Sequence, residues 1–313
     1  MRAGLAVSSL VAVIVVFIAV DAGPDCKSVS TSPTLPSFPP ANQDPPVELT
    51  KRVIKGTLMQ PGEAKFSASL WYKKPNPFTV NTGLDHVCGG TLIADRWVLT
   101  SAHCFDDNTF AGLSSLSDWE VVMGEYMQNV SGETGEQKFT IDAIYIHPQY
   151  NISTFDVALL FLNAPAQMSD YVGTLDIDKD PDCAATGSTC TVYGWGQDEE
   201  EPFGYGTVLP YKADVTIWDQ DACAQAFEGI SYVTVTGNEV CAAGTDGTDA
   251  CFGDSGGPLV CSCTKGPVVS GIVFTGVGCG RAEYPGVYER VSVFTGFITS
   301  TMAKHNGQQN ASQ

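Results

Sequence analysis

Basic residues are scarce in this chain. Its 313 residues include 16 Lys and Arg against 35 Asp and Glu, which gives a formal net charge of −19 at pH 7. Nucleic-acid binding requires a basic patch or stripe, and none is present, so we expect no nucleic-acid partner. A surface of this charge attracts basic peptides, but an acidic surface that only keeps the protein soluble explains the charge equally well.

Long hydrophobic runs are absent after the first residues. Arg2 precedes an apolar run from Leu5 to Val20, and Val20-Asp21-Ala22 carries small residues where a signal peptidase reads them. The run is shorter than the roughly 20 residues that a membrane-spanning helix needs, which argues against the alternative of an anchor. We therefore expect residues 1–22 to be a signal peptide and the protein to be secreted and extracellular, with no membrane association.

The usual signals for a cofactor or a metal are also missing. No phosphate-binding glycine loop precedes a helix, and the spacings of the 11 cysteines and 4 histidines do not suit zinc. No acidic loop is convincing enough to predict calcium. We expect no cofactor and no metal.

Cysteine, in contrast, is plentiful. Eleven cysteines in a secreted chain indicate disulfides, and the odd number leaves one cysteine unpaired or bridging to another molecule. Acceptor sequences for N-glycosylation at Asn129, Asn151 and Asn310 agree with a glycoprotein of the secretory pathway.

The composition divides the chain into segments. Residues 23–52 are rich in Ser, Thr and Pro and should be extended, and residues 307–313 form a polar tail. Between them, short apolar runs broken by Gly, Asn and Asp predict an all-β protein, with one helix at Val291–Lys304. The apolar face expected for this helix consists of Val293, Phe294, Phe297, Ile298 and Met302. The strand-like runs are Val87–Ile93, Trp97–Thr100, Trp119–Met123, Asp156–Leu162, Thr189–Tyr193 and Val268–Phe274.

A serine lies between glycines in the stretch Asp249-Ala-Cys-Phe-Gly-Asp-Ser-Gly-Gly-Pro-Leu-Val260. Such a turn suggests that Ser255 is a nucleophile. Gly253-Asp-Ser-Gly-Gly257 also fits the G-x-S-x-G elbow of α/β-hydrolases, in which the acid and the histidine follow the serine. After Ser255 there is no Asp, and the only His is His305. The α/β-hydrolase fold is therefore excluded.

The order His, Asp, Ser is available instead. A serine hydroxyl becomes a nucleophile when a base takes its proton, and a carboxylate must orient that base. His103 is the best candidate, because it ends an apolar strand and adjoins Cys104. His147 lies in a loop, and His305 lies in the predicted helix and should face solvent.

Several motifs follow one another along the chain: Cys88-Gly-Gly-Thr-Leu-Ile, Trp97-Val-Leu-Thr-Ser-Ala-His103-Cys, Phe155-Asp156-Val-Ala-Leu-Leu, Gly194-Trp-Gly, Gly253-Asp-Ser255-Gly-Gly-Pro and Pro285-Gly-Val-Tyr288. In this order they resemble the chymotrypsin/trypsin family of serine proteases. The resemblance covers residues 53–306. It implies two six-stranded antiparallel β-barrels, with the active site in the cleft between them and a C-terminal helix.

The resemblance also implies the catalytic residues. Ser255 is the expected nucleophile, His103 the general base and acid, and Asp156 the carboxylate that orients His103. The backbone N–H groups of Gly253 and Ser255 form the expected oxyanion hole. The implied reaction is hydrolysis of a peptide bond through an acyl-enzyme.

Lys51-Arg52-Val53-Ile resembles the activation site of the family. Residues 23–52 are then the pro-segment of a zymogen that is cut at Arg52–Val53. The new amino group of Val53 would pair with Asp254, because a buried carboxylate needs a cation. His86 matches a position that holds this aspartate before activation in family zymogens; the alternative is a simple surface histidine.

Asp249 matches the floor of the family's primary specificity pocket, where an acid selects Arg or Lys. Gly276 and Gly286 match the pocket walls and leave room for a long basic side chain. Ala250 lacks a hydroxyl that would help to solvate a lysine, so we expect Arg to be preferred over Lys. The alternative is a surface aspartate in a loop.

Gly271-Ile-Val-Phe-Thr-Gly276 departs from the usual Gly-Ile-Val-Ser-Trp-Gly of the family. Phe274 replaces a serine whose hydroxyl usually bonds the triad carboxylate, and Thr275 replaces a tryptophan of the adjoining subsites. A buried acceptor that lacks one hydrogen bond typically costs about 1–3 kcal/mol. We therefore expect reduced activity and an altered preference upstream of the cleaved bond.

The resemblance implies four disulfides: Cys88–Cys104, Cys190–Cys261, Cys223–Cys241 and Cys251–Cys279. Cys26, Cys183 and Cys263 remain. Either Cys26 tethers the pro-segment to Cys183, or Cys183 pairs with Cys263 and Cys26 is free; we favour the second arrangement.

The expected function is that of a secreted, trypsin-like serine endopeptidase made as a zymogen. Its expected partners are polypeptide substrates with Arg or Lys at the cleaved bond and protein protease inhibitors, and we expect a monomer. The alternative is a catalytically weak or inactive protease-like binding protein, which only Phe274 and Thr275 support. An adhesion or structural β-protein would leave the ordered triad unexplained.

Overall fold

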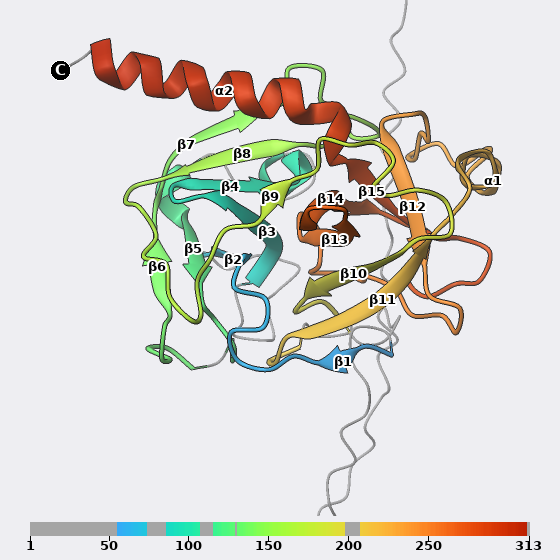
Figure 1. Ribbon diagram of the computed structural model, residues 1–313, viewed down its shortest axis with the longest axis horizontal. Coiled ribbons are helices and arrows are strands. Elements are labelled where there is room, and N and C mark those ends of the chain that lie inside the picture. Colours follow the sequence, from blue (N-terminus) through green and yellow to red (C-terminus); the bar gives the residue numbers. More distant parts are fainter. Residues whose placement is uncertain (1–54, 74–85, 107–114, 129, 198–206, 312–313) are drawn as a thin grey trace, which may run out of the picture. The chain divides into compact units, whose positions relative to one another are not determined.

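The structure, a computed structural model, describes residues 55–73, 86–106, 115–128, 130–197 and 207–311. The predicted signal peptide, the pro-segment with Cys26 and Arg52, Val53 and Asn129 therefore lie outside the described residues. Strands dominate the described part, and they form two sheets that lie side by side (Figure 1).

The first sheet, called here the N-terminal sheet, is antiparallel throughout. Its inner face buries a core that includes Leu70, Trp119, Val121 and Leu160. Apolar side chains on alternate strand positions share one face, so these strands bury that face together. In spatial order the strands are β6 (Gln137–Phe139), β5 (Trp119–Met123), β2 (Ser67–Tyr72), β3 (His86–Ala94), β4 (Trp97–Thr100), β8 (Ala158–Leu162) and β7 (Ile141–Ile146).

The second sheet closes on itself, and we call it the C-terminal barrel. The additional pairing of β11 with β12 joins the two ends of the six-strand path. In order around the barrel the strands are β11 (Tyr211–Ile217), β10 (Thr189–Gly194), β13 (Pro258–Cys263), β14 (Gly266–Thr275), β15 (Gly286–Arg290) and β12 (Glu239–Ala243). Two short strands are added outside this ring, β1 (Thr57–Leu58) on β11 and β9 (Asp176–Ile177) on β14.

The predicted all-β architecture with a C-terminal helix is confirmed, with two differences from the expected pair of barrels. Among the described residues no pairing joins β6 to β7, so the N-terminal sheet is a half-barrel. The β9–β14 pair is parallel, whereas every other pair is antiparallel. In the described residues the closure that the resemblance implied is therefore complete only in the C-terminal barrel.

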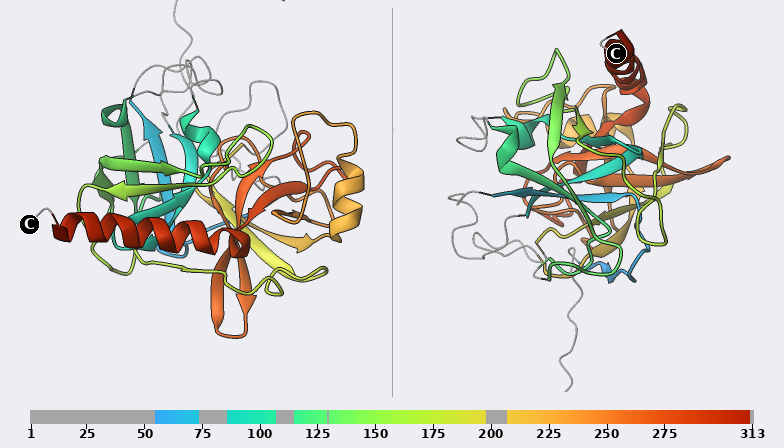
Figure 2. Two further views of the ribbon diagram at one scale, coloured as in Figure 1. Left: turned by 90° about the horizontal axis from the view of Figure 1, so that it is seen from above. Right: turned by 90° about the vertical axis from the view of Figure 1, so that its left-hand side faces the viewer.

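Two helices flank the sheets. The short α1 (Gln220–Ala226), which the sequence analysis missed, begins at Asp219, whose carboxylate accepts the backbone N–H groups of Asp221 and Ala222. The long α2 (Val291–Ala311) lies across β7 and β8 on the outside of the N-terminal sheet (Figures 1 and 2). No helix of the described chain is long and apolar enough to cross a membrane.

Helix α2 differs from its prediction. It continues to Ala311, past the predicted end at Lys304 and into the predicted polar tail at residues 307–313. Phe294 and Ile298 are buried as expected, but Val293 is 46% exposed. His305 does not face solvent. Its Nδ1 lies 2.5 Å from the Tyr145 hydroxyl, and its ring lies 3.8 Å from that of Phe161. Aromatic side chains of β7 and β8 thus provide a docking surface that the helical pattern alone could not reveal.

Candidate active site

His103 and Asp156 meet at the edge of the N-terminal sheet. His103 lies in a single 3-10 turn (Ala102–Phe105) directly after β4, and the Cys88–Cys104 disulfide ties this turn to β3. Asp156 precedes β8, the neighbour of β4, and is fully buried. Its Oδ1 accepts the backbone N–H of His103 at 2.6 Å, and its Oδ2 lies 2.5 Å from Nδ1 of the same residue. The carboxylate therefore orients both the main chain and the ring of His103.

This contact decides the charge preference of the imidazole. Burial disfavours a charged ring, but the adjacent Asp156 carboxylate outweighs burial and raises the pKa of His103 above its usual value of 6.5. A ring that is held at Nδ1 and stabilised as a cation suits a residue that takes up a proton and returns it.

Ser255 lies in a turn that only glycine permits. Gly256 has φ +78°, and a Cβ on it would overlap the Thr100 hydroxyl. The backbone N–H of Gly89, on β3, donates to the Ser255 carbonyl at 2.7 Å. The serine turn of the C-terminal barrel is thereby fixed against the N-terminal sheet.

One carbonyl group joins the serine turn to the histidine turn. The oxygen of Val273, on β14, accepts the backbone N–H of Gly256 at 2.8 Å and the hydroxyl of Ser101 at 2.9 Å. Gly256 follows Ser255, and Ser101 precedes the turn that carries His103. The structure thus brings the predicted serine, histidine and aspartate to one junction between the two sheets.

The two candidate oxyanion donors belong to peptide groups that are held from behind. The Phe252 carbonyl, in the peptide group that carries the Gly253 N–H, accepts the backbone N–H of Gln197 at 2.8 Å. The Asp254 carbonyl, in the peptide group that carries the Ser255 N–H, accepts the N–H of Gly257 at 2.9 Å. Because a trans peptide points its N–H away from its C=O, both donors face away from these acceptors.

His86 is half-buried, and its Nε2 lies 2.9 Å from the Gly253 carbonyl. It is therefore not a simple surface histidine, and its suggested role before activation stays a prediction. Its Nδ1 lies 2.8 Å from the hydroxyl of Ser69. Burial lowers the pKa of His86 to about 4, so the ring is neutral at physiological pH. His86 therefore supports the backbone of the candidate oxyanion hole.

Asp254 is a buried carboxylate held only by backbone groups among the described residues. Its Oδ1 accepts the N–H of Gly196 at 2.8 Å, and its Oδ2 accepts that of Cys251 at 2.9 Å. Burial raises its pKa to about 6. The expected partner, the amino group of Val53, lies outside the described residues.

Asp249 is also buried, with an exposed fraction of 3%. Its two carboxylate oxygens accept the backbone N–H groups of Ala250 and Gly280, each at 2.9 Å. A Cβ on Gly286 would lie 2.7 Å from Asp249 Oδ1, so the glycine leaves the carboxylate uncovered on that side. Gly276 follows β14, the strand that pairs with the strand of Gly286. A cavity of about 310 Å³ is lined by Asp249 together with Trp218 and Arg281, and Ser255 is not among its lining residues.

The side chains of Phe274 and Thr275, the two residues that depart from the family pattern, are packed against their neighbours. Phe274 is buried among Cys223, Phe227 and Val287, next to α1, and Thr275 is half-buried.

The backbone N–H of Asp156 donates to Glu289 Oε1 at 2.7 Å. Sequence reasoning missed Glu289; the only signal was a charged residue inside the apolar strand pattern of Gly286–Arg290.

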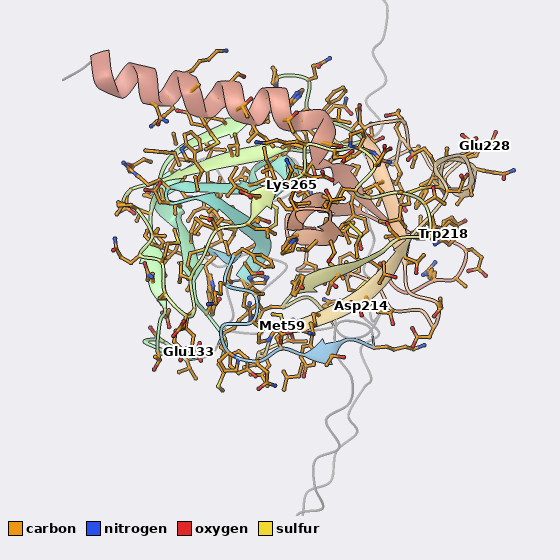
Figure 3. All side chains as sticks on the ribbon, in the orientation of Figure 1. Met59, Glu133, Asp214, Trp218, Glu228 and Lys265 are labelled. Carbon is orange, nitrogen blue, oxygen red and sulfur yellow. A yellow bond between two sulfur atoms is a disulfide. The ribbon has the colours of Figure 1, made fainter. Side chains whose placement is uncertain are left out.

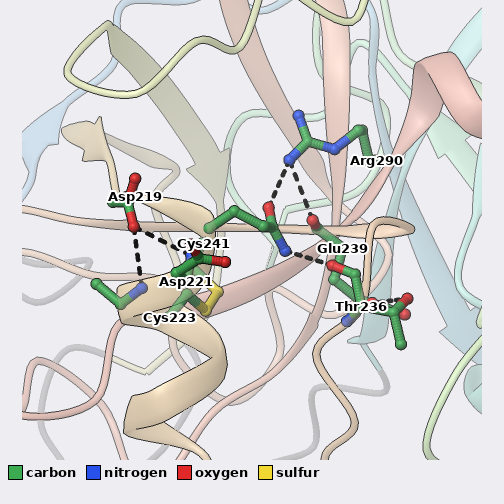
Figure 4. Close-up of a disulfide and its surroundings, with 9 residues drawn as sticks. Asp219, Asp221, Cys223, Thr236, Glu239, Cys241 and Arg290 are labelled. Atoms are coloured by element: carbon green, nitrogen blue, oxygen red, sulfur yellow. Dashed lines mark hydrogen bonds between the residues drawn. A yellow bond between two sulfur atoms is a disulfide. The ribbon is translucent and has the colours of Figure 1, made fainter.

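The structure contains five disulfides in its described part. Four are the pairs that the resemblance implied, and the fifth joins Cys183 to Cys263, the arrangement we favoured. The Cys223–Cys241 bridge fastens α1 to β12, beside Glu239 and Arg290 (Figure 4).

Two groups of side chains have the ligand spacing of a metal site in the described chain. One contains Cys88, His103 and Cys104, and the other Asp178, Cys183 and Cys263. All four cysteines are in disulfides and are therefore not available as thiolate ligands. Neither group suits a metal ion.

Two of the predicted glycosylation positions lie in the described chain. Asn151 is exposed in the loop before Asp156, and its Oδ1 accepts from the backbone N–H of Ser153 at 3.1 Å. Asn310 lies in the last turn of α2.

Comparison with known proteins agrees with this fold. The profile of the Trypsin family matches residues 53–298. Anionic trypsin of Canis lupus familiaris is 35% identical over 236 residues, which cover 74% of this chain and 86% of that protein. Transmembrane protease serine 9 of Rattus norvegicus is 32% identical over 83% of this chain but only 23% of its own length. Among solved structures, mouse neuropsin, a serine protease, has a TM-score of 0.65 and 31% identity over 79% of this chain and 99% of its own.

These matches define the class of protein as a serine protease, a hydrolase of polypeptides. The chain belongs to the trypsin family.

Proposed function

We propose that this protein is a secreted endopeptidase that cleaves after Arg, and less readily after Lys, once its zymogen is cut at Arg52–Val53. The observation that carries this proposal is the double hydrogen bond between Asp156 and His103, at the junction where Val273 joins the histidine and serine turns.

In this proposal Ser255 Oγ attacks the substrate carbonyl while His103 takes the hydroxyl proton. Asp156 stabilises the imidazolium that forms, and the N–H groups of Gly253 and Ser255 receive the negative charge of the tetrahedral intermediate. His103 then returns the proton to the leaving amine, and water repeats the sequence on the acyl-enzyme. The raised pKa of His103 supports its part as base and acid.

The preference for Arg rests on Asp249. A guanidinium group can bond both carboxylate oxygens in one plane, and Ala250 supplies no hydroxyl to an ammonium group. Asp249 already accepts two backbone N–H groups and lacks an ion-pair partner in the described chain, which supports a carboxylate kept for a cationic ligand.

Activation rests on Asp254. A buried carboxylate without a cation is expensive, and an inserted Val53 amino group would neutralise it. Secretion, glycosylation at Asn129, Asn151 and Asn310, a monomeric state and inhibition by protein protease inhibitors belong to the same proposal.

The test is hydrolysis of matched peptide amides that end in Arg, Lys or Phe. Chain cut at Arg52–Val53 should cleave after Arg first and Lys second. Ser255→Ala should abolish the hydrolysis, and Asp249→Ser should remove the preference for basic residues. Absence of hydrolysis by chain shown to begin at Val53 would contradict the proposal.

A further inference from the structure

Two glutamates face each other behind the candidate triad. Glu239 on β12 and Glu289 on β15 are directly opposite in the antiparallel pair, and both side chains are fully buried. Directly opposite residues of a strand pair have their Cβ atoms about 4.5–5.5 Å apart, and like charges in these positions repel. A buried acid pair is therefore costly to the fold and calls for an explanation.

The two carboxyl groups hold the two ends of one turn. Glu239 Oε1 accepts the hydroxyl of Thr154 at 2.9 Å, and Glu289 Oε1 accepts the backbone N–H of Asp156 at 2.7 Å. Between these contacts, Phe155 has φ +57°. A residue other than glycine keeps this left-handed conformation only where its surroundings enforce it. The acid pair supplies that restraint, immediately next to the aspartate that orients His103.

The other contacts of Glu239 fix it in place. Its Oε2 accepts the backbone N–H and the hydroxyl of Thr236, at 2.7 and 2.8 Å. The guanidinium of Arg290 donates to the Glu239 carbonyl and to Gln220 rather than to either carboxylate (Figure 4). The Glu239 carboxylate thus accepts three hydrogen bonds.

Glu289 is in the opposite situation. Its Oε2 is buried without a hydrogen-bond partner in the described chain, and no cation forms an ion pair with it there. The charged or titratable groups around it are Glu239 and Asp156, with His103 beyond Asp156 and Arg290 next along the strand. Burial, and then the charges of Glu239 and Asp156, raise the pKa of Glu289 to about 9. Glu289 therefore carries the proton of the pair at physiological pH.

We propose that Glu289 is a positioning residue for catalysis, which fixes the backbone of Asp156 so that both oxygens of that carboxylate meet His103. This inference rests on the triad proposed above. Glu289 touches neither substrate nor Ser255; it acts through Asp156.

The first experiment compares Glu289→Gln and Glu289→Leu in the activated chain, with Glu228→Leu on the exposed surface as the matched control. Glutamine keeps the acceptor oxygen without a charge, whereas leucine fills similar space without an acceptor. Misplacement of a catalytic group by about 1 Å can lower the rate about 100-fold, so Glu289→Leu should lower kcat by about 10- to 100-fold with KM little changed. Glu289→Gln should recover most of this rate.

The second readout is pH. Above about pH 9 the wild type should lose more kcat than Glu289→Gln, because Glu289 ionises beside Asp156, whereas deprotonation of the Val53 amino group affects both chains. An unfolded glutamate titrates near pH 4.3, so the folded wild type binds more protons than the unfolded chain between about pH 4.3 and pH 9. Over this window the stability of the wild type should fall relative to that of Glu289→Gln, so the Tm of the wild type should decrease relative to the Tm of the variant as the pH rises.

A third readout does not depend on hydrolysis. The proton between His103 Nδ1 and Asp156 should give a downfield ¹H NMR signal in the wild type and in Glu289→Gln, and this signal should be absent in Glu289→Leu. Wild-type chain that keeps this pattern but does not hydrolyse peptides would contradict the proposed function alone. Unchanged kcat and an unchanged downfield signal in Glu289→Leu would overturn the positioning role.

Discussion

The Asp249 side chain is almost fully buried and has no ion-pair partner in the described chain. Burial raises its pKa to about 7, and this effect exceeds the opposing effect of the Gly280 and Ala250 N–H groups. A cationic ligand binds the ionised form. Below pH 7 the ligand must therefore displace a proton, and its affinity should fall by about tenfold per pH unit. This can be measured as the Kd of a small aryl amidine between about pH 5 and pH 8.

The control for this titration is Asp249→Ser, in which amidine affinity should be low and independent of pH. A wild-type affinity that stays constant down to pH 5 would show that the Asp249 carboxyl is ionised throughout this range. Burial would then not raise its pKa to about 7.

At the scale of single residues, the sequence could predict those candidate site residues that occur in motifs arranged in a fixed order along the chain. Ser255, His103 and Asp156 occur in motifs, and the structure brings their segments together. Glu289 and Glu239 were not predicted, because their pairing depends on the register of β12 against β15, which no short pattern encodes. The contact of His86 with Gly253 was not predicted for a related reason: the two residues are distant in the sequence.

At the scale of elements, the predicted strands correspond to β3, β4, β5, β8, β10 and β14, whose apolar residues are consecutive or alternate strictly. Helix α1 was missed because it is short and buries only Cys223. Helix α2 was predicted from the helical period of its apolar residues. His305 was wrongly expected to face solvent, because its aromatic partners Trp97 and Phe161 lie on β4 and β8. Patterns within a segment could thus be predicted, and contacts between segments could not.

Phe274 shows how one element depends on another. Its ring packs between β14 and the region of α1, with Phe227 and Val287. Phe274→Ser should therefore leave a cavity and reduce the free energy of unfolding by about 3–5 kcal/mol, as for other buried Phe truncations. It should not raise kcat, because the new hydroxyl replaces a ring that packs with Phe227 and Val287, and both oxygens of Asp156 already bond His103. Urea unfolding and kcat on the Arg amide measure the two effects, with the half-buried Thr275→Ser as control.

A rise in kcat without a loss of stability would mean that the serine hydroxyl reaches Asp156 after all. In that case the expectation drawn from the sequence, that Phe274 weakens the triad, would be correct.

At the scale of the whole molecule, the net charge of −19 acts on every approaching substrate. Acidic side chains such as Glu133, Asp214 and Glu228 are spread over separate parts of the described surface (Figure 3). A field of this sign accelerates the encounter with basic peptides, and salt screens it, with a Debye length that shrinks from about 30 Å at 0.01 M to about 3 Å at 1 M.

The salt dependence of kcat/KM should therefore distinguish the contribution of the Asp249 pocket from that of the net surface charge. For an Arg amide flanked by lysines, kcat/KM should fall several-fold as salt rises from about 0.01 M to about 0.5 M, whereas kcat should stay constant. An Arg amide flanked by neutral residues should lose less, because only its single charge senses the field. Equal salt dependence for the two peptides would restrict electrostatic recognition to Asp249 and leave the acidic surface with a role in solubility alone.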